Sequence, residues 1–162
     1  MPLPLNRNPR FHQGYYKTIN SEKYIGKELP IYRSGIEREF FIFLDKNPNV
    51  LRWASEPLGI PYFDSVKRCN RKYYVDNYIE IKEGNIIKKY LVELKDHKET
   101  KKPDPKSKKK KTTLIYEQLA FETNCCKWKY AIEFSKKNNC EFLLLAHSKK
   151  DGFLPVKLDF LI

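Results

Sequence analysis

The stretch of sequence that decides the fold lies between positions 71 and 95. It reads Arg71-Lys72-Tyr73-Tyr74-Val75-Asp76-Asn77-Tyr78-Ile79-Glu80-Ile81, then a turn, then Lys89-Tyr90-Leu91-Val92-Glu93-Leu94-Lys95. Tyrosine, valine and isoleucine at this density favour extended structure, and the intervening Glu83-Gly84-Asn85 is typical of a turn. We therefore predict a β-hairpin whose tip centres near Glu83 and Gly84.

The predicted hairpin gathers charged side chains on one face. Because successive side chains of a strand alternate between faces, Glu93 and Lys95 share one face and the apolar residues beside them point to the other. With the tip at the expected position, Asp76 falls opposite Leu91, one pairing away from Glu93 and on its face. We expect two carboxylates and an ammonium group to converge there. Such an arrangement can hold a divalent metal beside a general base or a charge stabiliser.

Composition narrows the class of protein. The chain has 162 residues, of which 41% are hydrophobic and 14% aromatic, as expected of one globular domain with a real core. Its net charge of +12 predicts a polyanionic partner. No apolar run approaches the roughly 20 residues that span a bilayer, so we expect no membrane association. The four cysteines lack paired metal-ligand spacing, which favours reduced thiols in a cytoplasm over a zinc site or a disulfide framework.

The chain divides into an arm and a domain. Residues 1–31 have no clear period and predict an irregular arm that lies on the domain or on a partner. Residues 32–162 predict a single α/β domain with a mixed central sheet flanked by helices. Its expected elements are a helix from Ser34 to Asn47, strands at 50–56 and 60–63, the hairpin, a solvated lysine-rich loop at about 96–111, a helix at 112–137, a buried strand at 141–146 and a tail that packs or pairs.

The charged residues suit the chemistry of phosphodiester cleavage, which needs an activated water, a Lewis acid on the phosphate and charge stabilisation. Mg²⁺ prefers oxygen ligands, which Asp76, Glu93 and the Leu94 carbonyl would supply. Lys95 beside the metal could orient or deprotonate water. Glu37 would be a third acid that ligates the metal, acts through water or positions Lys95.

Each of these residues also has a purely structural interpretation. Glu37 follows Ser34 at capping-box spacing, which accounts for it without any catalytic role. Glu93 and Lys95 could form a salt pair at a strand end, and Asp76 could be a charge at a strand edge. These separate interpretations require three charged residues to fall on one face of the hairpin by accident. A shared site is the more economical explanation.

A resemblance to a known family adds to this interpretation. Asp76 followed by Glu93-Leu94-Lys95 matches the PD-(D/E)XK nuclease pattern, with Glu37 as the acid on the preceding helix. The wider context resembles the head completion nucleases of contractile-tailed bacteriophages, over roughly residues 15–146. The segments that carry it are Tyr32-Arg33-Ser34, Leu44-Asp45-Lys46-Asn47-Pro48, Trp53-Ala54-Ser55-Glu56, Ile60-Pro61-Tyr62, Arg71-Lys72-Tyr73, Asn124, Lys127-Trp128-Lys129 and Ala131.

The resemblance implies a restriction-endonuclease-like core and a DNA nuclease that acts when packaged heads are readied for tails. The implied catalytic residues are Glu37, Asp76, Glu93 and Lys95, with Mg²⁺ as the metal and Mn²⁺ as a substitute. The implied partners are double-stranded DNA and the portal, neck or other head–tail joining proteins. The expected location is the host cytoplasm during assembly, or the virion.

Basic residues around the site are candidate DNA contacts, because lysines on phosphates give sequence-independent binding that weakens with salt. These candidates are Arg71, Lys72, Lys101, Lys102, Lys108, Lys109, Lys110, Lys111, Asn124 and Lys127. A solubilising surface loop is the alternative for the lysine run. Glu56 is a further candidate for the acid cluster, and Trp128 is expected in the core. Two other classes of protein remain open: a non-catalytic DNA-binding or structural neck or head component, and a basic RNA-binding protein.

Overall fold

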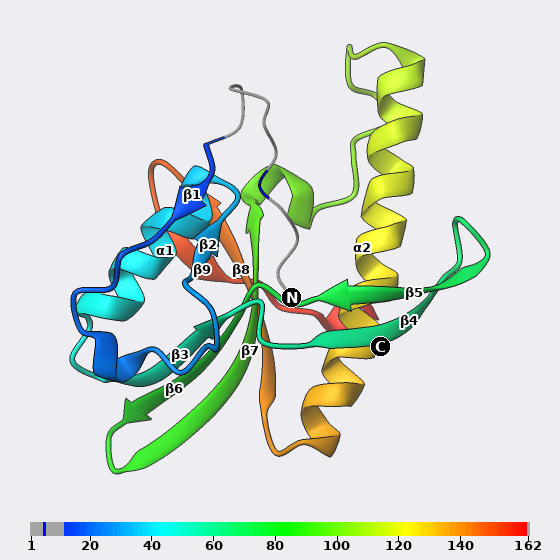
Figure 1. The fold of residues 1–162 in the computed structure, drawn as a ribbon. Helices are drawn as coiled ribbons and strands as arrows, with labels where there is room; N and C mark the ends of the chain where they lie inside the picture. The colour runs from blue at the N-terminus through cyan, green and yellow to red at the C-terminus, as the bar shows by residue number, and fades with distance from the viewer. Residues whose placement is uncertain (1–4, 6–11, 162) are drawn as a thin grey trace.

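A five-stranded mixed sheet forms the centre of the protein, with the strand order β3-β6-β7-β8-β9 (Figure 1). The structure is a computed structural model that describes residues 5 and 12–161. The five strands are β3 (Val50–Ser55), β6 (Asn77–Glu83), β7 (Ile86–Asp96), β8 (Glu141–Ser148) and β9 (Gly152–Pro155). Only β7 and β8 are parallel; the other neighbours are antiparallel. The mixed α/β architecture predicted from the sequence is confirmed.

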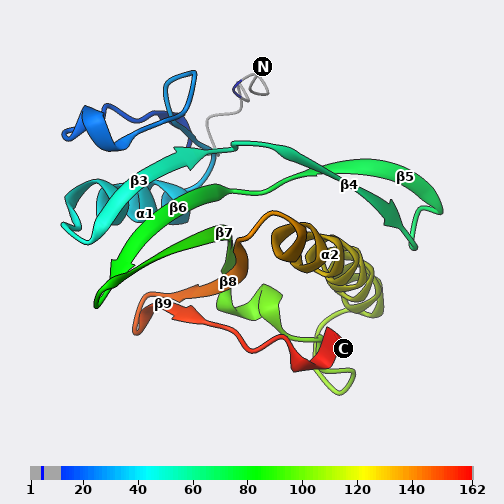
Figure 2. The same ribbon diagram turned by 90° about the horizontal axis from the view of Figure 1, so that it is seen from below.

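Two helices cover opposite faces of this sheet (Figure 2). The first, α1 (Gly35–Lys46), begins after Ser34, whose Oγ accepts a hydrogen bond from the Glu37 N–H at 3.2 Å, and ends at Asn47. The second, α2 (Lys111–Lys137), is the crossover that parallel strands require and joins β7 to β8. Both helices agree with the sequence prediction.

The packing follows the alternation of side chains along β7. Val92 and Leu94 are buried with Phe40 and Phe41 of α1 and with Trp53. Leu91 lies on the other face, in a cluster contributed by α2 and a separate hairpin. That hairpin consists of β4 (Gly59–Asp64) and β5 (Cys69–Tyr74), which, among the described strands, pair only with each other. Figure 2 shows the hairpin along one side of α2, with the C-terminal segment on the other.

The predicted hairpin at 71–95 needs two corrections. The segment 71–81 is not one strand: its first half is β5, and the chain enters the central sheet only at Asn77, after Val75 and Asp76. The register also differs, because Leu91 lies opposite Tyr78 and not Asp76.

The turn explains the register. Glu83 pairs with Ile86, which leaves Gly84 and Asn85 as a two-residue loop centred one position later than expected. Gly84 has a φ of +62°, which glycine adopts without steric cost and which two-residue hairpin turns require. Moving the centre by one position shifts every pairing by two, so the faces assigned to the side chains are unchanged.

Part of the N-terminal segment lies on α1. Of the predicted arm at 1–31, residues 1–4 and 6–11 are outside the described residues. The described part contains a small antiparallel pair and a short 3₁₀ helix: β1 (Gly14–Tyr15), β2 (Ile31–Tyr32) and η1 (Ser21–Lys23). The buried Asp45 of α1 accepts hydrogen bonds from Tyr16, Ile19 and Asn20, which ties this segment down.

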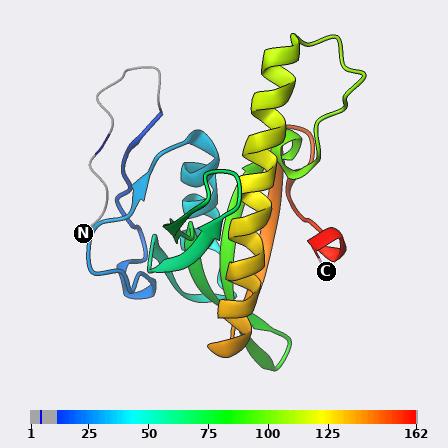
Figure 3. The same ribbon diagram turned by 90° about the vertical axis from the view of Figure 1, so that its right-hand side faces the viewer.

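Two further short 3₁₀ helices complete the described elements, η2 (His97–Thr100) and η3 (Asp159–Leu161). Within η2 only Thr100 is buried, and His97, Lys98 and Glu99 are exposed like the lysines that follow. Beyond it, the first turns of α2 project past the sheet (Figure 3). No helix in the described part of the chain is long and apolar enough to cross a membrane.

Candidate active site

The site lies at the carboxyl end of β7, on the face of the sheet that α2 covers. Glu93 is only 3% exposed, and its Oε1 forms an ion pair with the Lys95 Nζ at 2.9 Å. Burial lowers the pKa of Lys95, but the carboxylates of Glu93 and Asp76 outweigh burial and raise the pKa above its ordinary value. Lys95 is therefore a firmly protonated ammonium in the metal-free site.

Asp76 occupies the place that β6 leaves empty. Since β6 begins at Asn77, opposite Val92, the continuation of β7 has no antiparallel neighbour there. Asp76 fills the gap with its side chain: Oδ2 accepts a hydrogen bond from the Leu94 N–H at 2.7 Å. The carbonyl of Leu94 faces the same side as its N–H, because both groups of a strand residue point toward the same neighbour.

The two carboxylates lie close enough to affect each other. Burial raises the pKa of Asp76 well above its usual range, and the charges of Glu93 and Glu37 raise it further. Lys95 and the Leu94 N–H act in the opposite direction without cancelling that shift. A site that raises the pKa of a carboxylate in this way is one that would gain from a bound cation.

Glu37 joins the site from the first turn of α1. Its Oε2 accepts a hydrogen bond from the Arg33 N–H at 2.6 Å, one residue before the position that a capping box uses. Burial raises the pKa of Glu37, and the charge of Glu56 adds to this effect. The capping interpretation is thus correct in part, yet Glu37 still contributes its charge to Asp76.

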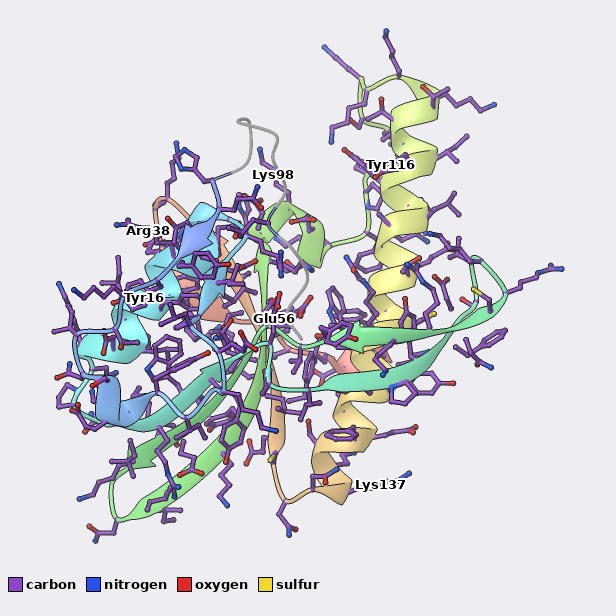
Figure 4. The ribbon with its side chains drawn as sticks, in the orientation of Figure 1. Tyr16, Arg38, Glu56, Lys98, Tyr116 and Lys137 are labelled. Carbon is purple, nitrogen blue, oxygen red and sulfur yellow. The ribbon has the colours of Figure 1, made fainter. Side chains whose placement is uncertain are left out.

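Glu56 lies beside this cluster, in the bend between β3 and β4 (Figure 4). Its backbone N–H donates to the Asp76 carbonyl at 2.9 Å, and its φ of +44° is in the left-handed region that glycine favours. Its carboxylate is held by Arg33, with 2.7 Å between Nε and Oε1. Glu56 therefore makes a backbone contact with Asp76, while its carboxylate is ion-paired with Arg33 and acts on Glu37 through its charge.

Comparison with known proteins gives the family. The family model described as "TnsA-like endonuclease N terminal" matches residues 47–147, from the end of α1 through most of β8. The chain belongs to the TnsA-like endonuclease family. It is also 33% identical to the head completion nuclease of Enterobacteria phage T4 over 138 residues, which are 83% of this chain and 90% of that protein. The matched family region contains Asp76, Glu93 and Lys95, whereas Glu37 precedes it.

In this TnsA-like domain, one side chain that contacts the acids was not among the site residues predicted from the sequence. Tyr73, on β5, is 4% exposed and donates from its hydroxyl to Oε2 of Glu93 at 2.6 Å. Burial and the charges of Glu93 and Asp76 raise the pKa of Tyr73 well above its usual range. The only signal for Tyr73 in the sequence is a tyrosine hydroxyl at a position where the alternation along the strand predicts burial. That signal does not show that the hydroxyl donates to Glu93.

Among the predicted basic contacts of this endonuclease-like domain, Lys127 of α2 lies beside the tyrosine that contacts Glu93. Its Nζ lies 5.8 Å from the centre of the Tyr73 ring. Burial lowers the pKa of Lys127, and the neighbouring Lys95 lowers it further. Asn124, one turn earlier on α2, is partly buried.

The other predicted basic contacts lie further out. Arg71 is paired with the buried Asp64, at 3.2 Å between its guanidinium and Oδ2, and Lys72 is exposed on β5. Lys109 pairs with Glu117 at 2.7 Å. The remaining lysines before and at the start of α2 are all exposed: Lys101, Lys102, Lys108, Lys110 and Lys111. Figure 4 shows the projecting start of α2, marked by Tyr116, where this run leads.

The donor set of the TnsA-like site is rich in oxygen. Across residues 5 and 12–161, no three His, Cys, Asp or Glu side chains come together as a complete metal cage. All four cysteines are free thiols, so they are not joined by disulfides. The oxygens available at the site are those of Asp76 and Glu93 and the Leu94 carbonyl. Two carboxylates are what a Mg²⁺ site typically takes from protein, because waters and substrate phosphate fill the remaining positions.

Proposed function

We propose that the protein is a Mg²⁺-dependent DNA nuclease that acts in phage head completion, before or during head–tail joining. The observation that carries this proposal is the convergence of Asp76, Glu93 and Lys95 where β6 has left the edge of β7. A pure binding module has no need for a buried and a partly buried carboxylate beside cations, because they oppose DNA unless a metal lies between them. Family membership and the similarity to a head completion nuclease support both the chemistry and its setting.

The residues at the site fit a divalent cation. The raised pKa of Asp76 reports an uncompensated negative charge, which a cation held by Asp76, Glu93 and the Leu94 carbonyl would offset. When bound, the ion supplies a Lewis acid for the phosphate and lowers the pKa of a bound water. Mn²⁺ accepts the same oxygen ligands, so it should substitute.

The roles of Lys95 and Glu37 follow from their charges. Lys95 stabilises the negative charge that develops on the phosphate, or orients and deprotonates the attacking water. Its raised pKa favours charge stabilisation in the metal-free state, because a protonated ammonium cannot accept a proton. Glu37 assists from α1, either by ligating the cation, through water or by holding Lys95.

The substrate that we propose is double-stranded DNA. The net charge of +12 and the exposed lysines before α2 supply sequence-independent affinity for phosphate. We also retain portal, neck or other head–tail joining proteins as partners, and the host cytoplasm or the virion as the location. These assignments rest on the nature of the relative and not on a contact in the structure.

Digestion of plasmid DNA by the purified protein tests the proposed function. Wild-type protein should nick or cut supercoiled DNA with Mg²⁺ or Mn²⁺ and be inactive in EDTA. Glu93→Ala should be inactive, whereas Glu83→Ala, at the other end of the same hairpin, should cut normally. Comparison of circular and linear substrates separates endonuclease from exonuclease action. Protein that binds DNA but never cuts it with either metal would instead be a scaffold component of the neck or head.

A further inference from the structure

The hydroxyl of Tyr73 donates a hydrogen bond to one of the two carboxylate oxygens of Glu93. Its oxygen lies 2.6 Å from Oε2, while Oε1 is held by Lys95 at 2.9 Å. A hydrogen bond to an ionised acceptor at this distance is of the short, strong kind. Glu93 therefore has a defined orientation before any cation or DNA arrives.

The β4–β5 hairpin exists outside the central sheet and brings Tyr73 to this place. Tyr73 pairs with Ile60 of β4, and both are buried in the cluster that contains Leu91 of β7 and Ala131 of α2. The ammonium of Lys127 lies over the tyrosine ring on the α2 side. The ring is thus held on two sides, and its hydroxyl has little freedom to turn away from Glu93.

The engaged oxygens leave a specific set for a cation. Oε2 of Glu93 is taken by Tyr73, and Oδ2 of Asp76 is taken by the Leu94 N–H. Within the described residues, Oδ1 of Asp76 has no hydrogen-bond partner, and the contact of Glu93 Oε1 is the ion pair with the partly exposed ammonium of Lys95. These two oxygens are the ones that a cation can use without breaking a hydrogen bond to a buried group.

We propose that Tyr73 is a positioning residue that fixes Glu93 for cation binding, by holding Oε2 so that Oε1 is presented toward Asp76. This inference rests on the proposed metal-dependent nuclease function. It assigns a task to the β4–β5 hairpin, which the catalytic set of Glu37, Asp76, Glu93 and Lys95 does not include. Groups that orient metal-binding side chains typically affect metal affinity or activity by about 10–100-fold.

A purely structural role for Tyr73 makes a different prediction. Buried tyrosine hydroxyls usually find a partner, so the bond to Glu93 could serve folding alone. In that case its removal would lower stability and leave cation affinity unchanged. Tyr78 provides a matched control, because its hydroxyl donates to Oε1 of the buried Glu80 at 2.7 Å, outside the site.

The test is Mn²⁺ binding by the whole protein without DNA, measured by electron paramagnetic resonance of the free ion. Tyr73→Phe should bind Mn²⁺ about 10–100-fold more weakly than wild type, while Tyr78→Phe should bind within twofold of it. Melting temperatures of both variants separate folding from affinity. Replacement of Tyr73 by p-aminophenylalanine, which restores a donor on the same ring, should recover most of the affinity.

Equal Mn²⁺ affinity in Tyr73→Phe and wild type would overturn the inference and leave the proposed function standing. Wild-type protein that neither binds Mn²⁺ nor cuts DNA would overturn the proposed function itself. If Tyr73→Phe does not fold, wild-type protein with ¹³C-labelled tyrosine rings replaces it. A hydroxyl bonded to Glu93 predicts that one ring Cζ resonance moves when Mg²⁺ is added, and the inference fails if none does.

Discussion

Asp45 is the buried carboxylate that ties residues 16–20 to α1, and we predict a large loss of stability when it becomes asparagine. The residue is fully buried, and its oxygens accept from the Ile19 N–H at 2.6 Å, the Asn20 N–H at 2.9 Å and the Tyr16 hydroxyl at 3.0 Å. Asparagine has nearly the same shape but only one acceptor oxygen. One donor must therefore face an amide N–H₂ group.

The magnitude follows from those three hydrogen bonds. A buried donor left without an acceptor costs about 1–3 kcal/mol, and the two remaining bonds lose about 1 kcal/mol each because their acceptor is no longer charged. We expect Asp45→Asn to lower the free energy of unfolding by about 3–5 kcal/mol. For a chain of this size, that corresponds to a fall in melting temperature of roughly 6–20 °C.

The pH dependence of the stability difference between wild type and Asp45→Asn provides a second test. Burial raises the pKa of Asp45, but hydrogen bonds from Ile19, Asn20 and Tyr16 outweigh it and hold the pKa below its ordinary value. Because the folded-state pKa is the lower one, the stabilisation is complete above the unfolded value of about 3.9 and is lost as pH falls through the folded pKa. The difference between wild type and Asp45→Asn should therefore be constant at neutral pH and narrow below about pH 4.

Urea unfolding followed by circular dichroism measures these differences. Asp104→Asn is the control, since Asp104 is exposed and accepts one loop hydrogen bond that asparagine can also accept. A loss below about 1 kcal/mol for Asp45→Asn, or one equal to that of Asp104→Asn, would refute the reasoning, because buried unsatisfied donors are costly.

Three further predictions concern the site and its substrate. Replacing the exposed Lys108, Lys110 and Lys111 by alanine should reduce the slope of log affinity for DNA against log salt by up to about 2.7. A double alanine variant at Lys136 and Lys137, at the far end of α2, should leave this slope unchanged. Asp76→Asn should abolish cutting yet raise the melting temperature of the protein in EDTA at pH 7. Because the pKa of Asp76 is raised in the folded state, its ionised form destabilises the fold above about pH 4. A lower melting temperature for Asp76→Asn would contradict this. Glu37→Gln should keep its bond from the Arg33 N–H and hence its stability, while cutting falls about 10–100-fold; unchanged cutting would confine Glu37 to helix capping.

Local patterns in the sequence were sufficient for most of the elements. The cap at Ser34, the long period of α2 and the alternation along β7 are each decided by neighbouring residues, and each agrees with the structure. The faces assigned to Glu93 and Lys95 depended only on the period of a strand. They tolerated an error of two positions in the register.

The features that the sequence did not predict depend on contacts between distant residues. No local signal says that the chain changes sheets at Val75 and Asp76, because tyrosine and valine suit either sheet. The partnership of Tyr73 with Glu93 spans 20 positions and requires the β4–β5 hairpin to fold back along α2. Asp45 was likewise indistinguishable from a surface acid until residues 16–20 were seen to close over it.

In the proposed nuclease, a cation held by the carboxylates at the end of β7 acts together with Lys95 in DNA cleavage. The most direct measurement is the single-turnover rate of plasmid nicking at saturating Mg²⁺ for Lys95→Met, with Lys98→Met as the control just beyond β7. Lys95→Met should bind Mn²⁺ and DNA normally but nick about 10²–10⁴-fold more slowly, while Lys98→Met should match wild type. Nicking by Lys95→Met at the wild-type rate would mean that Lys95 has no part in DNA cleavage.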